Sequence, residues 1–180
     1  MKKALHLFLA AILAAGSTSL AFADASNPSA DQRLAGRVRH ELAMIPQVTV
    51  FDNLGYRVDG GTVTLYGQVR NAVVKDEAQS SLKHLEGVEH VDNRIEVLPA
   101  SFNDDRIRRQ VARALFNDPR LFNYAVQPVA PIRIIVKNGH VNLEGVVRTE
   151  GDKNDAFIRA NTVPGVFSVE NNLQVEQSKG

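Results

Sequence analysis

The strongest constraint on the fold of this 180-residue chain is that its structure-specifying residues occur twice. The pattern of apolar residues and glycines at 31–99 recurs at 104–176. From the middle of each unit onward, matching residues are a constant 78 positions apart, as are Gly61 and Gly139. Nearer the start of each unit the shift is 73, so the second copy carries five extra residues after Pro119. Each unit of about 70 residues exceeds the usual length of a stacked repeat, which favours two discrete tandem domains.

The N-terminal residues are typical of an export signal. Lys2 and Lys3 precede a short apolar run, and Ala21-Phe22-Ala23 fits a cleavage site for removal after Ala23. We therefore expect a bacterial periplasmic protein with no membrane span after processing. The sequence contains no cysteine, so it offers neither a disulfide nor a lipid-modified cysteine. The expected layout is a signal peptide at 1–23, a flexible leader at 24–30, the first domain at 31–99, a linker at 100–103, the second domain at 104–176 and a tail at 177–180.

Apolar periodicity gives both units the same order of elements: helix, strand, strand, helix, strand. Leu34, Val38 and Leu42 recur at a spacing of four, which predicts a helix with one buried face after an N-cap at Asp31. In the second unit, Asn103 or Asp104 is expected to cap the matching helix. The expected strands are 55–58, 62–66 and 91–97 in the first unit, and 132–137, 140–147 and 169–175 in the second, where the second helix is expected at 149–163.

This order predicts an α+β fold with two tandem small domains. In each domain two helices pack on one face of a three-stranded mixed sheet, because three strands cannot bury both faces by themselves. The short linker also predicts that the domains pack on each other. Asn138-Gly139 is a strong signal for a tight hairpin turn. Six glycines are expected to be structural, serving turns, helix ends and strand ends: Gly61, Gly67, Gly87, Gly139, Gly145 and Gly165.

Two motifs, each present in both units, resemble the BON domain. The pattern Gly-x-Val-x-Leu-x-Gly-x-Val stands at 61–69 and 139–147, and Gly-Val-x-x-Val-x-Asn stands at 87–93 and 165–171. An export signal followed by two such units is similar to the OsmY-like branch of this family, the osmotically inducible periplasmic proteins. The resemblance implies a non-enzymatic envelope module that interacts with phospholipid membranes or, in that branch, with unfolded or exported proteins. It implies no cofactor and no catalytic residue.

The residues themselves also give no sign of a catalytic, metal-binding or cofactor-binding site. The histidines that remain after processing have no metal-ligand spacing, and the chain has no activated-serine motif, phosphate loop or dinucleotide fingerprint. The formal net charge is +1. Removing Lys2 and Lys3 leaves 19 basic and 20 acidic residues, or −1, whereas a nucleic-acid-binding domain is usually basic. We therefore expect a monomer with no enzyme activity, cofactor, metal or nucleic-acid partner.

One cluster of charge is a candidate site. Arg106, Arg109 and Arg113 are spaced to share the helix face opposite the apolar stripe, with Arg108 nearby. A solvated helix face explains such a run. The alternative is a contact with anionic lipid head groups, worth about 1 kcal/mol for each arginine close to the surface.

The first unit has a weaker version of this cluster in Arg33, Arg37 and His40. Near the stronger cluster, Phe116, Leu121 and Phe122 are either exposed apolar contacts or core residues, because periodicity does not separate the two. Two functions remain open. One is a peripheral phospholipid-membrane interaction module with an anionic phospholipid surface as its partner. The other is a periplasmic chaperone that shields client envelope proteins; a basic patch favours the first and an apolar groove the second.

Overall fold

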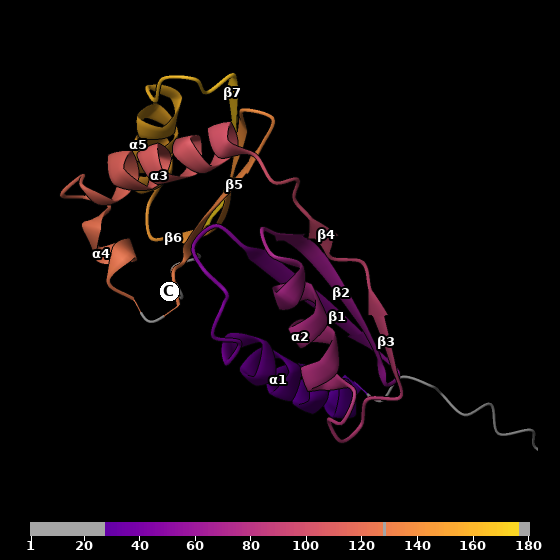
Figure 1. Ribbon diagram of the computed structural model, residues 1–180. Helices are drawn as coiled ribbons and strands as arrows, with labels where there is room; N and C mark the ends of the chain where they lie inside the picture. Colours follow the sequence, from indigo (N-terminus) through magenta and orange to yellow (C-terminus); the bar gives the residue numbers. More distant parts are fainter. Residues whose placement is uncertain (1–27, 128, 177–180) are drawn as a thin grey trace, which may run out of the picture.

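The computed structural model describes residues 28–127 and 129–176. The predicted signal peptide and tail, and most of the predicted leader, lie outside these ranges. The first domain contains α1 (Pro28–Ala43), β1 (Asn53–Asp59), β2 (Thr62–Val69), α2 (Ala72–Leu82), β3 (His90–Asn93) and β4 (Glu96–Val97). The second contains α3 (Phe102–Phe116), α4 (Phe122–Ala125), β5 (Ile132–Lys137), β6 (His140–Val147), α5 (Glu150–Asn161) and β7 (Ser168–Val175). Figure 1 shows the two sheets with their helices, and the predicted α+β class is confirmed.

Each sheet is mixed and has the hairpin's second strand at its centre. In the first domain, β2 runs antiparallel to β1 and parallel to both β3 and β4. Thr62 lies opposite His90 and Gln68 opposite Glu96, a shift of 28 residues in both cases, so β3 and β4 continue one interrupted strand position. In the second domain, β6 pairs with an unbroken β7 at the same shift of 28.

The two helices of each domain cover the same sheet face. In the first domain, the alternate strand residues Val63 and Leu65 are fully buried in one cluster with Val38 of α1 and Ala78 of α2. Successive strand residues point to opposite faces, so one shared cluster places both helices on one side. The second domain repeats the arrangement, with strand residues and residues of α3 and α5 in one core.

The glycines expected to be structural all adopt positive φ: Gly61, Gly67, Gly87, Gly139, Gly145 and Gly165. Asn138 and Gly139 have φ of 53° and 80°, as a two-residue type I′ hairpin requires. At Gly145 (φ 118°) a Cβ would lie 1.9 Å from the carbonyl oxygen of Pro131. The neighbouring backbone occupies that space.

The predicted helix starts were wrong. α1 begins at Pro28, so Asp31 lies in its first turn, where its carboxylate accepts a hydrogen bond from the Gly60 amide at 3.3 Å. α3 is capped by Ser101, whose hydroxyl accepts from the Asp104 amide at 3.2 Å; neither Asn103 nor Asp104 is its cap. Apolar spacing marks the buried turns of a helix, and each helix begins before its first buried residue.

The domains pack on each other, as the short linker predicted. The Ile134 amide at the edge of the second sheet donates to the Val50 carbonyl at 2.9 Å. Lys137 forms an ion pair with Glu96 at 2.5 Å. Val50 and Phe51 of the loop between α1 and β1 also pack against the core of the second domain. Within the described residues, no helix is both long enough and apolar enough to cross a membrane.

Candidate functional site

The arginine stripe predicted on the first helix of the second domain lies at the surface. Arg106, Arg109 and Arg113 are exposed on α3, while the opposite positions Ile107 and Val111 are completely buried. With a rise of 1.5 Å per residue, seven residues place the first and third arginines about 10 Å apart along the helix axis. The stripe therefore offers three positive charges to one flat partner.

Arg108 does not belong to this surface, which corrects the prediction. Its side chain is only 3% exposed, and its guanidinium donates to the Asp105 carboxylate at 2.7 Å and to the Val136 carbonyl at 2.5 Å. Around it lie the linker residue Ala100 and, from the first domain, Arg70, Leu98 and Pro99. Arg108 is thus a structural residue at the junction of the domains and is not accessible to a lipid head group.

Phe102 extends the arginine stripe at its N-terminal end and was not singled out from the sequence. It is the first residue of α3 and is 97% exposed. Its spacing to the three arginines is four, seven and eleven residues, so all four side chains share one helix face. The sequence reading placed Phe102 in the linker, where apolar periodicity gives no information.

A second exposed aromatic side chain lies at the same end of the domain. Asp104, in the first turn of α3, accepts hydrogen bonds from the amides of Asn138 and Gly139 at 2.9 and 2.8 Å, which holds the β5–β6 hairpin turn against the helix start. Phe167 donates its amide to the Gly139 carbonyl at 2.9 Å and its ring covers that glycine. The Phe167 side chain is nevertheless 74% exposed. We call Phe102, Phe167 and the arginine stripe the aromatic-basic surface.

The three arginines differ in how firmly they are held. Arg106 donates to Gln110 at 3.0 Å, to the Pro164 carbonyl at 3.4 Å and to Asn103 at 2.7 Å. Arg109 and Arg113 make no side-chain hydrogen bond or ion pair with any residue that the structure describes. These two guanidinium groups are therefore available to an external anion, whereas Arg106 also supports the loop beneath Phe167.

The corresponding end of the first domain has different side chains. Arg33, Arg37 and His40 are exposed as expected, but Arg37 donates to the Glu86 carbonyl at 2.7 Å. Glu89 covers Gly61 there and donates its amide to the Gly61 carbonyl, in the way that Phe167 covers Gly139. The first domain thus carries a carboxylate at the position where the second carries an aromatic ring.

The apolar side chains near the stripe divide between core and surface. Leu121 is completely buried and Phe116 is half-buried against the core, whereas Phe122 on the short helix α4 is exposed. Among residues 28–127 and 129–176, no group of three or more histidine, cysteine or carboxylate side chains is arranged to hold a metal ion.

Comparison with known proteins places the chain in a family. The family model of the BON domain matches residues 30–99 and 103–177. The outer membrane lipoprotein DolP of Haemophilus influenzae is 31% identical over 144 residues, which cover 77% of this chain and 71% of that protein. The C-terminal domain of CdsD, a structural protein of the type III secretion system of Chlamydia trachomatis, shares 14% identity over 80% of this chain and 98% of its own, but at a TM-score of 0.28. The two family matches fall on the two sheets, and the chain belongs to the BON domain family, with two copies of the domain.

Proposed function

We propose that this protein is a non-enzymatic module of the bacterial envelope that binds anionic phospholipid through the aromatic-basic surface of its second domain. The observation that carries the proposal is the placement of Phe102, almost fully exposed, on the same face of α3 as three exposed arginines. Aromatic side chains favour the boundary between head groups and acyl chains, and arginines pair with phosphate groups. The membrane association of the relative DolP, an outer membrane lipoprotein, agrees with this role.

The charges and the rings make separate contributions. Each arginine close to an anionic surface contributes about 1 kcal/mol, so three give weak and salt-sensitive binding. Because the guanidinium groups are exposed, ions screen them over about 8–10 Å at physiological salt. Insertion of Phe102 and Phe167 adds an apolar contribution that salt does not screen. The predicted signal peptide would deliver the protein to the periplasm, where such lipid surfaces are present.

Vesicle co-sedimentation tests the proposal. Binding should be measurable on vesicles rich in phosphatidylglycerol at low salt, fall steeply between low and moderate salt, and be negligible on phosphatidylcholine. The double variant R109Q/R113Q should greatly weaken binding without loss of stability, because neither side chain forms a hydrogen bond or ion pair with any described residue. F102S should weaken binding at every salt concentration.

The first domain provides the matched control. R33Q/R37Q removes the same charge from the corresponding helix, where Glu89 stands in the place of Phe167, and should leave vesicle binding nearly unchanged. Equal losses in the two double variants, or binding that ignores salt, would contradict the proposed surface.

The chaperone alternative is favoured by one observation. Phe122, Val126 and Val129 are all exposed along the segment that contains the five extra residues of the second domain. Such a run is a site for an apolar segment of another protein. If the protein suppresses aggregation of an unfolded client, and F122S/V126S removes that activity while R109Q/R113Q does not, the chaperone function is supported independently of lipid binding.

A further inference from the structure

The two domains enclose a pocket that shares no residue with the aromatic-basic surface. It has a volume of about 310 Å³ and lies between the end of α1, the following loop and β1 on one side, and residues Gln127, Val129, Ala130 and Arg133 on the other. The second-domain wall comes from the stretch that includes the extra residues of that copy. Neither domain alone forms this pocket.

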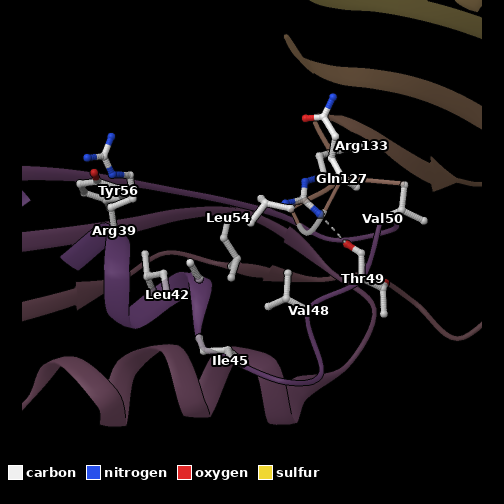
Figure 2. Close-up of a pocket in the computed structure, with 13 residues that line it drawn as sticks. Arg39, Leu42, Ile45, Val48, Thr49, Val50, Leu54, Tyr56, Gln127 and Arg133 are labelled. Carbon is white, nitrogen blue, oxygen red and sulfur yellow. Dashed lines mark hydrogen bonds between the residues drawn. The ribbon is translucent and has the colours of Figure 1, made fainter. Parts of the chain in front are cut away.

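The floor of the pocket is apolar. Leu42 of α1, Ile45 and Val48 of the following loop and Leu54 of β1 line it, and Figure 2 shows them between two polar ends. Arg39 and Tyr56 lie at one end, and Arg133 and Gln127 at the other. Ligand pockets commonly combine a mostly apolar lining with a few polar groups that fix orientation, and they begin at about 300 Å³.

Arg133 is the most unusual charge in the pocket. It is half-buried on β5 and donates one hydrogen bond, to the Thr49 carbonyl at 3.0 Å, but has no ion-pair partner within the described residues. Burial lowers the pKa of its guanidinium, and the charge of Asp52 offsets this only in part. Asp52 itself is engaged elsewhere, accepting from the Thr49 amide and hydroxyl and from the Arg70 amide.

The two positive charges of the pocket are therefore balanced only in part, by the charge of Asp52 acting on Arg133. Arg39, exposed at the other end, also has no ion-pair partner in the described part of the chain, and no lining residue is acidic. A partly desolvated guanidinium without a carboxylate partner is unfavourable, and an anion would relieve it. The apolar floor favours an anion with a hydrocarbon chain, and a volume of about 310 Å³ is on the scale of a single such chain.

We propose that the pocket between the two BON domains binds a single-chain anionic amphiphile of the fatty-acid class. The carboxylate pairs with Arg133, and the acyl chain lies on Leu54, Leu42 and Ile45 and runs toward the other end of the pocket. Because the ligand contacts both domains, its binding stabilises their packing.

Titration of the ¹⁵N-labelled protein with decanoate, followed by NMR, tests this site. Saturable shifts should appear at amides of residues 48–50, 54–56 and 133. Acetate, which lacks the chain, and decyltrimethylammonium, which carries the opposite charge, should bind at least tenfold more weakly.

Three variants locate the ligand. R133Q should weaken decanoate binding about tenfold, as expected for loss of a partly buried charge contact. R39Q should weaken it by about threefold or less, because Arg39 is exposed and lies at the other end of the pocket, where it adds only a longer-range attraction. A43F places a ring at the pocket wall from an exposed position at the end of α1 and should abolish binding without lowering the unfolding midpoint. The matched control R109Q/R113Q should bind decanoate like the wild type, and R39Q should still bind vesicles. Failure of the pocket proposal is therefore distinguishable from failure of the proposed membrane surface.

Several results would overturn the assignment. These are the absence of saturable shifts at the pocket amides, equal binding of decanoate and decyltrimethylammonium, equal binding of acetate, or undiminished decanoate binding by A43F. The last criterion does not depend on R133Q, whose loss of the Thr49 contact also loosens the domain junction.

Discussion

Replacing Asp104 with alanine should destabilise the second domain far more than the matching change at Asp31 destabilises the first. Asp104 is 2% exposed, and its carboxylate accepts hydrogen bonds from the amides of Asn138 and Gly139 at 2.9 and 2.8 Å. Asp31 is less buried and accepts one bond, from the Gly60 amide at 3.3 Å. Both lie in the first turn of their helix, so their interactions with the helix dipole largely cancel in the comparison.

The expected magnitude follows from the number and burial of the donors left behind. Hydrogen bonds to a charged group contribute about 1.5–3 kcal/mol each, and an unpaired buried amide costs about 1–3 kcal/mol. With two bonds lost and the Gly139 amide left without its acceptor at a buried position, D104A should lower the free energy of unfolding by about 3 kcal/mol. D31A loses one long bond and should cost about 1 kcal/mol or less.

Urea unfolding followed by two-dimensional NMR gives a separate unfolding midpoint for each domain. With an m-value of about 1.5 kcal/mol/M, D104A should move the midpoint of the second domain by about 2 M. D104N, which keeps one acceptor oxygen, should fall between D104A and the wild type. If D104A and D31A lower the urea midpoints of their domains equally, the hydrogen bonds from Asn138 and Gly139 to Asp104 are not a major source of stability, and the reasoning fails.

Two further predictions concern other charged residues. R108M should destabilise the second domain by about 1–3 kcal/mol in urea unfolding, because the Val136 carbonyl and Asp105 lose their donor, and should leave vesicle co-sedimentation unchanged. Asp118 has a lowered pKa because it accepts from the Arg120 amide and pairs with Arg159, so the stability it provides is present above about pH 4 and is lost as the pH falls through its folded-state pKa. Melting temperatures between pH 2 and pH 7 should therefore fall less steeply at the acid end for D118N than for the wild type.

The features predicted well from the sequence were those fixed by local geometry. The strands 132–137 and 140–147 have the predicted bounds, because alternating apolar residues on either side of Asn138-Gly139 leave little choice of register. The mixed sheet and the shared helix face followed from the order of elements. The capping residue Ser101 was missed because a cap is identified by one hydroxyl contact, which apolar spacing does not report.

The features missed by the sequence reading depend on contacts between the domains. Arg108 is buried because the linker and the first domain lie over a position that one domain alone would leave at its surface. The pocket around Arg133 likewise has walls from both domains. Periodicity within one unit contains no information about these contacts.

Comparison of the two copies separates residues that specify the fold from those that specify function. Where the copies agree, as at Gly61 and Gly139, both domains need the same backbone conformation, here a positive φ. Where they differ at an exposed position, as in the exchange of Glu89 for Phe167 beside an unchanged turn, the fold does not dictate the side chain. Substituting Glu for Phe167 should therefore remove the apolar part of vesicle binding while leaving the hairpin intact, because the first domain already folds with a carboxylate at that position. Loss of the hairpin in F167E would show that the ring is part of the scaffold and would weaken its assignment to the membrane surface.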